Sequence, residues 1–473
     1  MRAGPAALLL GCILAVGLPR GAAAGAQGQE PAWLQVESEH FIFIFEPRDR
    51  EAANELLTFC EPIYQKVCGF FGSWPKKIPC VIRGRVDEAN GVTMSFPSKI
   101  ELYLTAPTDH FLGARTESWL KGLLTHELTH YVHQTMDRGL FHGLSSVFGA
   151  EVTTLGLTFL PGWMIEGPAV FDETRFTEGG RGRNPLFEMY PKALVEQGKL
   201  FSLSQAGYLS SFPPPDRIYV AGDLLLEHIS AAYGEDAFRR IMDLYLDFPF
   251  FGPWDAIRRV TGRNADEIFA DLREDLQRKY RQASVSGGGG TLVSPDRIGD
   301  WTHPQQTRAG LFLYRHSPYE PSAIIRLDPA AGTERVVATG SLTDFFSFSA
   351  APDGATLCFS SEKVDMRDQS APVITADLFL VDTGTGRQRQ LTRNAHLWHP
   401  ALSPDGRRII AVQGVGPYTR LVSVDTASGS LRVLFSRAEG NVYTPAFSPD
   451  GSRIAFTFNL RGFQDVYVAE TAA

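Results

Sequence analysis

The sequence has little of three features that would each mark a class of protein. Its 473 residues include five cysteines, too few for a disulfide-stabilised scaffold. Its 45 Lys and Arg are outnumbered by 53 Asp and Glu, and the net charge of −8 argues against a nucleic-acid partner, because phosphate binding depends on clustered basic residues. After the first residues no apolar run is long enough to span a membrane. The remaining composition, 44% hydrophobic and 21% charged, is that of a globular protein of about two to three domains.

The N-terminus has the pattern of a secretory signal. Arg2 precedes an uncharged run over residues 3–19, and small residues at 22–26 offer signal-peptidase sites. The run is shorter than the about 20 apolar residues that a membrane span needs. We therefore interpret residues 1–26 as a signal peptide and expect a secreted or periplasmic protein with no transmembrane span in the mature chain. Alternatively, the segment ending at Cys12 is similar to a bacterial lipobox, which would make the protein a lipoprotein.

Export would place three further cysteines, Cys60, Cys68 and Cys80, in an oxidising compartment, where one disulfide is open to them. Cys60 and Cys68 lie two turns apart on a predicted helix, too far to pair directly. Either would reach Cys80 only through tertiary proximity, and three buried free thiols are the alternative.

The spacing of apolar residues predicts an α+β domain over residues 27–282. From residue 116 to about 279 the spacing is mostly helical, and Leu120, Leu124 and Leu128 would share one helix face. Strands followed by helices are typical of α+β proteins. The expected elements of the first half are strands at 41–45, 78–82 and 100–104 and a helix at 51–71.

A linker and a repeat follow this domain. Residues 283–294 contain the sequence ASVSGGGG, have no apolar periodicity and are predicted to be a linker. In residues 295–473 the turn sequence Pro-Asp-Gly occurs three times, and its aspartates Asp353, Asp405 and Asp450 are 52 and 45 residues apart, the period of propeller blades. Proline fixes φ, aspartate caps the turn and glycine adopts a positive φ there.

The repeat resembles the TolB-type β-propeller of bacterial periplasmic proteins. This resemblance implies an all-β propeller over residues 295–473, which would bind an envelope protein or recruit a substrate. With an earlier unit at 311–337 that lacks the turn sequence, about four blades fit. This is fewer than is usual for TolB-type propellers, so we expect an incomplete ring, with closure by few blades as the alternative.

The segment His126-Glu127-Leu128-Thr129-His130 carries the clearest chemistry. Residues four apart on a helix lie one above the other, so His126 and His130 can both offer imidazole nitrogens to one zinc ion. Glu127 lies beside them, where its carboxylate can take a proton from a water that the metal activates. A catalytic zinc needs a third protein ligand. Two core histidines without a metal are the alternative.

Two later segments match one superfamily. The sequence from Trp163 to Ala169 resembles the WxxEGxA signature of gluzincin metallopeptidases, the superfamily of thermolysin and aminopeptidase N. The resemblance implies that Glu166 is the third zinc ligand. Glu173, seven residues later on the same helix face, would orient a histidine, or is a solvated charge. The sequence from Tyr219 to Glu227 resembles the YxxGxxLL segment, which implies that the Tyr219 hydroxyl donates to the oxyanion; an ordinary packing role is the alternative.

Over residues 31–282 the resemblance is to the bacterial peptidase-MA-like gluzincin domain, here fused to a TolB-type propeller. It implies that the strand at 100–104 is the edge strand that pairs with an extended peptide. The extra apolar stretch at 140–160 would cover the cleft or touch a membrane surface. A GxMEN motif is missing from the sequence, which weakens an aminopeptidase assignment and leaves endopeptidase activity open.

Three nearby residues each have two alternative roles. His133, one turn after His130, is expected at the surface or in contact with a metal ligand. Arg181 and Arg183 would clamp a substrate carboxylate, or are solvated loop charges. Other substrate-binding residues are not assigned.

The sequence therefore predicts a multidomain zinc metallopeptidase acting on a peptide or protein substrate. A non-catalytic envelope binding or scaffold protein, in which the propeller is the functional part, is the main alternative. Hydrolysis of another acyl group is a third, because zinc-dependent hydrolysis acts on several.

Overall fold

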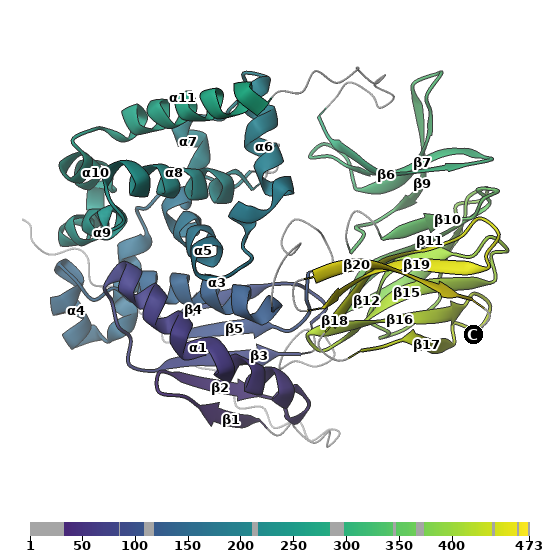
Figure 1. The fold of residues 1–473 in the computed structure, drawn as a ribbon, viewed down its shortest axis with the longest axis horizontal. Helices are drawn as coiled ribbons and strands as arrows, with labels where there is room; N and C mark the ends of the chain where they lie inside the picture. The colour runs from purple at the N-terminus through teal and green to yellow at the C-terminus, as the bar shows by residue number, and fades with distance from the viewer. Residues whose placement is uncertain are drawn as a thin grey trace, which may run out of the picture. The chain divides into compact units, whose positions relative to one another are not determined.

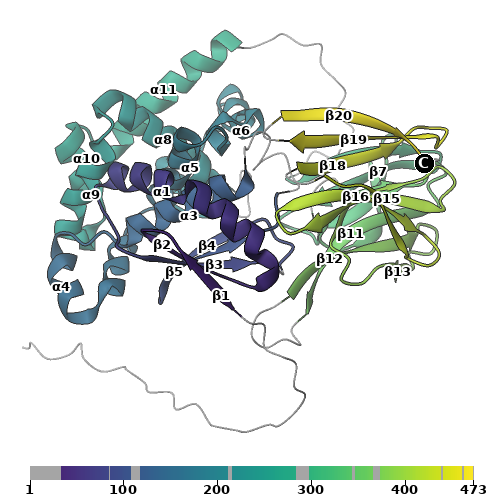
Figure 2. The same cartoon turned by 60° about the horizontal axis from the view of Figure 1, so that its bottom comes forward.

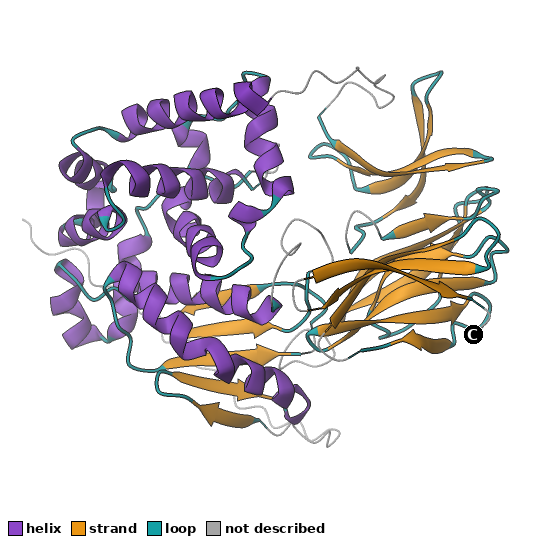
Figure 3. Ribbon diagram, in the orientation of Figure 1, coloured by secondary structure: helices purple, strands orange, loops and turns teal. Residues whose placement is uncertain are grey.

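The computed structural model describes residues 33–471 apart from eight short gaps, and Figure 1 shows the order of the elements. The signal peptide, Cys12 and the linker beyond Ala283 lie outside the described residues. Figure 3 shows that the helices belong to the N-terminal part and that the C-terminal part is drawn as strands and loops. The gaps are residues 85, 108–117, 211–215, 284–297, 344–346, 366–372, 438–439 and 461–462.

The N-terminal part contains one five-stranded mixed sheet in the order β1-β2-β3-β5-β4. The predicted strands and the predicted helix α1 (Arg50–Phe71) are confirmed within a few residues. β2, β3 and β5 are parallel, and α1 makes the crossover from β2 to β3. Alternate residues of β2 are buried, as expected for a sheet covered on one face. The strands are β1 (Leu34–Glu37), β2 (Phe41–Phe45), β3 (Ile78–Arg83), β4 (Gly91–Ser95) and β5 (Ser98–Tyr103).

The expectation that the strand at 100–104 forms the edge of the sheet is wrong. β5 lies between β3 and β4, so that β4 is the edge strand. β4 escaped the sequence analysis because it is only five residues long and none of its residues is fully buried, so it has no strongly apolar face. A two-residue turn at Phe96 and Pro97 joins β4 to β5.

Helices pack on this sheet and on one another. α1 and α3 lie together over one face of the sheet, where Leu120, Leu124 and Leu128 are all buried, as their spacing predicted (Figure 1). The helices after α1 are α3 (Trp119–Gln134), α4 (Leu140–Phe148), α5 (Gly162–Phe176), α6 (Pro185–Glu196), α7 (Leu203–Ala206), α8 (Arg217–Tyr233), α9 (Ala237–Asp247), α10 (Trp254–Thr261) and α11 (Ala265–Ala283). Short 3₁₀ helices are η1 (Pro47–Asp49), η2 (Ala150–Leu157), η3 (Arg181–Arg183) and η4 (Pro249–Phe251).

α5 and α8 approach each other closely at a pair of glycines. A Cβ on Gly167 would lie 2.6 Å from the Cα of Gly222, and a Cβ on Gly222 would lie 2.4 Å from the Cα of Gly167. Neither backbone can move away without separating the helices, so both positions require glycine. Glu166 directly precedes the first glycine and Tyr219 lies three residues before the second. This crossing therefore determines how the two predicted functional residues face each other.

The C-terminal part consists of four consecutive antiparallel sheets, the arrangement of propeller blades (Figure 2). The predicted unit without the turn sequence, at 311–337, belongs to the first sheet. Apolar clusters join each sheet to the next; one cluster, for example, contains Phe312 of the first sheet and Phe359 of the second. The first two sheets are β6 (Asp300–Thr307), β7 (Gly310–His316), β8 (Ala323–Asp328) and β9 (Thr333–Thr339), then β10 (Phe348–Ala350), β11 (Thr356–Asp365), β12 (Val373–Asp382) and β13 (Gln388–Gln390). The third and fourth are β14 (Leu397–Leu402), β15 (Arg408–Val415), β16 (Tyr418–Asp425) and β17 (Leu431–Phe435), then β18 (Gly440–Phe447), β19 (Arg453–Leu460) and β20 (Phe463–Glu470).

The recurring Pro-Asp-Gly sequence forms the turns between the first and second strands of three sheets. Gly354, Gly406 and Gly451 have φ of 73°, 69° and 73°, as predicted for glycine in these turns. In the second copy the Asp405 carboxylate accepts hydrogen bonds from the Ser403 hydroxyl at 2.6 Å and the Arg407 backbone N–H at 3.1 Å. The repeat therefore has a structural role at each turn.

The cysteines of the described residues, Cys60, Cys68, Cys80 and Cys358, are buried free thiols. The open choice between a bridge and free thiols is thus resolved in favour of free thiols. Burial raises the pKa of Cys68 to about 12, which keeps this thiol protonated and unreactive. In the part of the chain that the structure describes, no helix combines the length and apolar character needed to cross a bilayer.

Candidate metal centre

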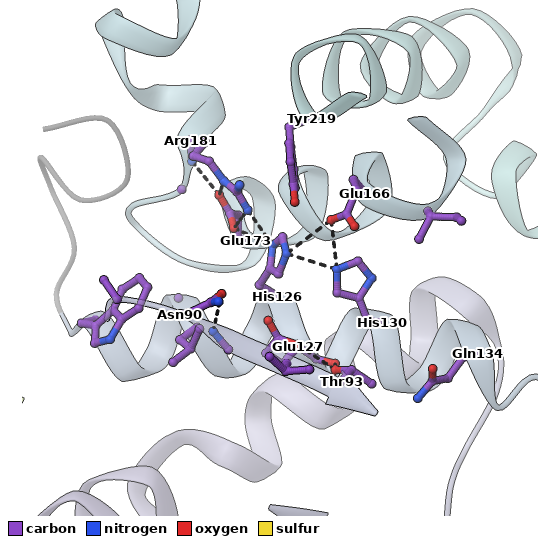
Figure 4. A pocket seen from close by; sticks show the side chains of 18 of the residues that line it. Asn90, Thr93, His126, Glu127, His130, Gln134, Glu166, Glu173, Arg181 and Tyr219 are labelled. Atoms are coloured by element: carbon purple, nitrogen blue, oxygen red, sulfur yellow. Dashed lines mark hydrogen bonds and ion pairs between the residues drawn. The ribbon is translucent and has the colours of Figure 1, made fainter. Parts of the chain in front are cut away.

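Two helices bring the predicted zinc ligands together. His126 and His130 lie one turn apart on α3, and Glu166 faces them from the first turns of α5 (Figure 4). The two histidine Nε2 atoms are 3.2 Å apart. Glu166 Oε2 lies 3.2 Å from His130 Nε2 and 3.8 Å from His126 Nε2.

These three atoms fit a zinc ion. Zinc–nitrogen and zinc–oxygen bonds of about 2.0–2.1 Å at tetrahedral angles place neighbouring ligand atoms about 3.3–3.4 Å apart. The three separations of 3.2, 3.2 and 3.8 Å bracket that value. Two imidazoles and one carboxylate are also the donor set of catalytic zinc, which keeps one further position open. The assignment of His126, His130 and Glu166 as ligands is therefore compatible with the geometry, and it stays a prediction.

The charges of the ligands reinforce one another. Burial alone would raise the pKa of Glu166, but the neighbouring His130, and then His126, outweigh burial and lower this pKa to about 2. Burial would lower the pKa of His130, but the Glu166 carboxylate outweighs it and raises the pKa. Glu166 is thus an anion at any physiological pH, the state in which a carboxylate binds a metal.

Glu127 lies between α3 and the edge strand β4. The Thr93 hydroxyl lies 2.8 Å from Glu127 Oε2 and 2.8 Å from the Glu127 backbone oxygen, and it donates to one of them. A Cβ on Gly91 would lie only 2.7 Å from Cγ of Glu127. β4 therefore approaches α3 closely because residue 91 is glycine, and Thr93 then restrains the Glu127 carboxylate.

Glu173 is not a solvated charge. Its buried carboxylate on α5 accepts a hydrogen bond from His126 Nδ1, with Oε2 and Nδ1 2.9 Å apart. A proton on Nδ1 leaves Nε2 of the same ring free to bind a metal. Burial raises the pKa of Glu173, but Arg181 and His126 outweigh burial and hold it far below its usual value. The expected contact of Glu173 with a histidine is therefore present.

Arg181 has neither of its two expected roles. Its side chain is only 10% exposed, so it is not a solvated charge. Its guanidinium donates from Nε to Glu173 Oε1 at 2.8 Å and from Nη2 to Glu173 Oε2 at 2.9 Å, so its charge is not free to clamp a substrate. Arg183 is exposed and donates to the backbone oxygens of Thr177 and Gly179.

Tyr219 comes from α8 and faces the same space as the ligands. Figure 4 shows its hydroxyl pointing toward His126 and Glu166. Burial and the nearby Glu166 carboxylate raise the pKa of Tyr219 above that of a free phenol. The hydroxyl therefore stays protonated and can donate a hydrogen bond.

These side chains line one pocket of about 450 Å³. β4 forms one wall, and Leu157 of η2 contributes to another. The apolar stretch at 140–160 therefore reaches the cleft, as expected, and contact with a membrane stays a prediction. The lining residues from β4 and the preceding segment include Asn90, Gly91, Thr93 and Ser95.

The expected location of His133 is wrong. Its ring is 1% exposed and stacks on Phe71 with the ring centroids 5.2 Å apart. Burial, and then the charge of His130, lower the pKa of His133 to about 3, so the ring is neutral. Its two nitrogens contact no hydrogen-bond partner among the described residues.

Sequence reasoning missed Thr93 and Gly91 and did not find the partner of Arg181. Thr93 and Gly91 lie on a strand that the sequence analysis did not identify. The glycines around Arg181 signalled a constrained loop, but its partner Glu173 could be found only from the packing of the loop on α5.

Comparisons with protein-family models and with curated proteins find no match. Among solved structures, the chain is similar to a candidate TolB of Agrobacterium tumefaciens, with 23% identity, a TM-score of 0.30, and coverage of 37% of this chain and 62% of that one. It is similar to TolB from Acinetobacter baumannii, with 20% identity, a TM-score of 0.31 and coverage of 37% and 42%. An oligogalacturonate lyase in complex with manganese shares 20% identity at a TM-score of 0.27, with coverage of 34% and 48%. The chain spans less than two thirds of each of these structures. The strand order of the four sheets, independently of these similarities, is that of propeller blades.

Proposed function

We propose that this chain is a zinc-dependent hydrolase of the gluzincin type that cleaves peptide bonds. The observation that carries the proposal is the convergence of His126, His130 and Glu166 at separations that suit one tetrahedral zinc ion. Glu127 and Tyr219 line the same pocket. Bound there, zinc would supply a Lewis acid that activates a water and polarises the substrate carbonyl.

The residues of the chain have separate tasks in this proposal. The Glu127 carboxylate, held by Thr93, takes the proton of the attacking water and returns it to the leaving amine. The Tyr219 hydroxyl donates a hydrogen bond to the carbonyl oxygen as negative charge develops on it. Glu173 keeps the proton of His126 on Nδ1.

A peptide is the substrate that β4 favours. As the edge strand, β4 has one side that pairs with no strand in the part of the chain that the structure describes, and it lines the pocket beside Glu127. An extended peptide can add to such an edge through main-chain hydrogen bonds, which brings its carbonyl groups along the pocket. This support is specific to a polypeptide and does not apply to other acyl compounds.

We also propose that the protein is exported and that the four C-terminal sheets recruit the substrate or an envelope protein. The pattern of residues 1–26 supports export. Both groups of side chains with metal-binding geometry that occur among the described residues lie in the N-terminal part, which supports placing the proposed chemistry there.

Zinc analysis of the full chain, together with digestion of a peptide library, tests the function. We expect about one zinc per chain and cleavage that a chelator abolishes and added zinc restores. Glu166→Gln should lower the zinc content while the chain stays folded. A chain that binds zinc and cleaves no peptide would favour the scaffold or the non-peptide alternative. A chain without zinc would overturn the proposal.

A further inference from the structure

Arg181 contacts both sides of the candidate site. It begins the short helix η3 and turns its guanidinium into the pocket, between the carboxylate of Glu173 and the ring of Tyr219 (Figure 4). The three residues come from η3, α5 and α8. Arg181 therefore links α5 to α8, a helix that begins well beyond it in the sequence.

On one side, Arg181 fixes the carboxylate that orients His126. Glu173 Oε1 accepts from Nε and from the backbone N–H of Arg181, at 2.8 and 2.9 Å. Oε2 accepts from Nη2 and from His126 Nδ1, both at 2.9 Å, and Arg181 Nη2 also lies 2.8 Å from His126 Nδ1 itself. Four donors thus use both oxygens, and an arginine fork holds a carboxylate in one plane. The imidazole of His126 takes its orientation from that plane.

On the other side, the guanidinium lies over the ring of Tyr219, with Cζ 4.9 Å from the ring centroid. A cation at this distance from an aromatic face is attracted to it, more strongly where water is excluded. Because Arg181 is buried and already fixed by Glu173, this contact restrains the plane of the phenol ring. The direction of the hydroxyl depends on that plane.

The loop is shaped to hold Arg181 in this place. Gly180 has φ of 88°, and a Cβ there would lie 2.4 Å from the Cα of Thr174 on α5. The backbone N–H of Gly182 donates to the Thr174 hydroxyl at 3.0 Å. The two glycines on either side of Arg181 thus let the loop lie directly on α5, and the arginine has little freedom to move.

We propose that Arg181 is a positioning residue that couples the metal ligand His126 to the transition-state donor Tyr219. Through Glu173 it fixes the imidazole, and through its face it fixes the phenol. The inference rests on the proposed function. It adds a residue whose charge holds the side chains of the site in place and does not bind the substrate.

The first test measures metal binding without any peptide. Arg181→Gln removes the charge, and Arg181→Lys keeps the charge but cannot form the fork. Arg183→Gln is the matched control, because it removes an arginine of the same loop that does not contact the site. Zinc affinity is measured by competition with a chelator, and the cobalt-substituted protein reports ligand geometry through its visible absorption.

We expect Arg181→Gln to weaken zinc binding roughly 10- to 100-fold, as loss of groups that support metal ligands does. Arg181→Lys should shift the cobalt spectrum, and Arg183→Gln should change neither quantity. Should Arg181→Gln fail to fold, Arg181→Lys carries the test. Unchanged affinity and an unchanged spectrum in the folded Arg181 variants, or equal losses in Arg183→Gln, would overturn the proposal and leave the proposed function standing. Failure of the wild-type chain to bind zinc would overturn both.

The second test is a double-mutant cycle on peptide cleavage with Arg181→Lys and Tyr219→Phe. If Arg181 positions the phenol, Arg181→Lys should lower kcat less in the Tyr219→Phe background than in the wild type, because the hydroxyl is already lost. Losses that simply multiply would contradict the coupling to Tyr219, with kcat and KM separating this effect from weaker substrate binding.

Discussion

The glycines around the pocket and the turn glycine Gly406 of the sheets serve different purposes. In the N-terminal part, Gly91, Gly167 and Gly222 lie where a Cβ would collide with neighbouring atoms, so glycine brings backbones together around the pocket. In the C-terminal part, Gly406 has a positive φ, and a Cβ added there would meet no atom within 4 Å, so glycine only allows a turn. Close approach is not confined to the pocket, because a Cβ on Gly440 of the fourth sheet would lie 2.2 Å from Cζ of Phe458. The comparison therefore contrasts the pocket glycines with this turn glycine, and it does not divide the two parts as wholes.

Two buried aspartates, one in each part, differ in whether both of their carboxyl oxygens accept hydrogen bonds. Asp377, in the second sheet, accepts hydrogen bonds from the Thr392 hydroxyl and from the backbone N–H groups of Asn394 and Ala395. Asp223, on α8, is equally buried, and its Oδ1 contacts no donor among the described residues. Asp377 is therefore satisfied by its donors, whereas Asp223 is a buried carboxyl group with one oxygen that lacks a donor among the described residues, at a cost in stability.

The largest effect on kcat is expected from substitution of the proposed base, Glu127. Glu127→Gln keeps the size of the side chain and removes the base, so kcat should fall roughly 10²- to 10⁴-fold with zinc content and thermal stability unchanged. Glu178→Gln, the same change at an exposed position of the same part, should leave kcat unchanged. Discontinuous assays of peptide cleavage measure kcat in the two variants, and metal analysis measures their zinc content. Equal activity of Glu127→Gln and the wild type would refute the role of the base.

The next effect tests the glycine crossing of α5 and α8. Gly167→Ala inserts a methyl group against the backbone of Gly222, which should cost about 1–3 kcal/mol of stability and separate Glu166 from the histidines, so zinc affinity should also fall. Gly69→Ala is the control, because Gly69 is an exposed glycine of α1 with open space around it. That substitution should stabilise the chain by about 0.5–1 kcal/mol. Thermal unfolding and zinc titration give the two quantities, and equal stability changes in the two variants would contradict the crossing.

The sequence was sufficient for the parts of the site that lie on helices. His126, Glu127 and His130 are fixed to one another by helical geometry alone, and the apolar spacing of α3 placed that helix correctly. Glu166 and Tyr219 were found through short motifs, and the glycines of those motifs are the residues that make the helices cross. Short motifs and apolar periodicity therefore predicted the residues whose positions depend on the geometry of their own helix.

The sequence could not predict the features of the site that depend on packing between segments far apart in the chain. β4 is a short edge strand with no fully buried residue, so Thr93 and its contact with Glu127 were missed. Arg181 was recognised as a candidate, but its charge is neutralised by Glu173, a pairing that depends on how the loop packs on α5. His133 was placed wrongly because its burial depends on Phe71 of α1, which packs against its ring and lies far away in the sequence.

A pH-dependent effect sharpens the comparison of the two buried aspartates. Burial, and then the negative charges of Glu227 and Glu173, raise the pKa of Asp223 to about 8, well above its unfolded value. Between these pKa values the folded chain binds a proton that the unfolded chain has released, so stability falls as the pH rises. Asp223→Asn cannot ionise and should gain stability over the wild type with rising pH, by at most about 1.4 kcal/mol per pH unit.

The control for this prediction is Asp377→Asn. It replaces a carboxylate whose acceptor positions are used by four donors, and it should destabilise the chain at every pH. Thermal unfolding of both variants between pH 5 and pH 8 measures the difference. A stability difference between Asp223→Asn and the wild type that does not change with pH would show that Asp223 does not hold a proton in the folded chain.

The smallest effect is expected at a turn of the four sheets. Gly406→Ala places an alanine at φ of 69° with no atom close enough to collide, so only the backbone preference opposes it, by about 1 kcal/mol. Because the turn does not contribute to the pocket, zinc affinity and kcat should equal those of the wild type. Thermal unfolding, zinc titration and peptide cleavage on one preparation distinguish this from Gly167→Ala, where all three should change. A loss of cleavage in Gly406→Ala at unchanged zinc affinity would mean that the sheets take part in presenting the substrate, and the assignment of a purely structural role to this turn would then be wrong.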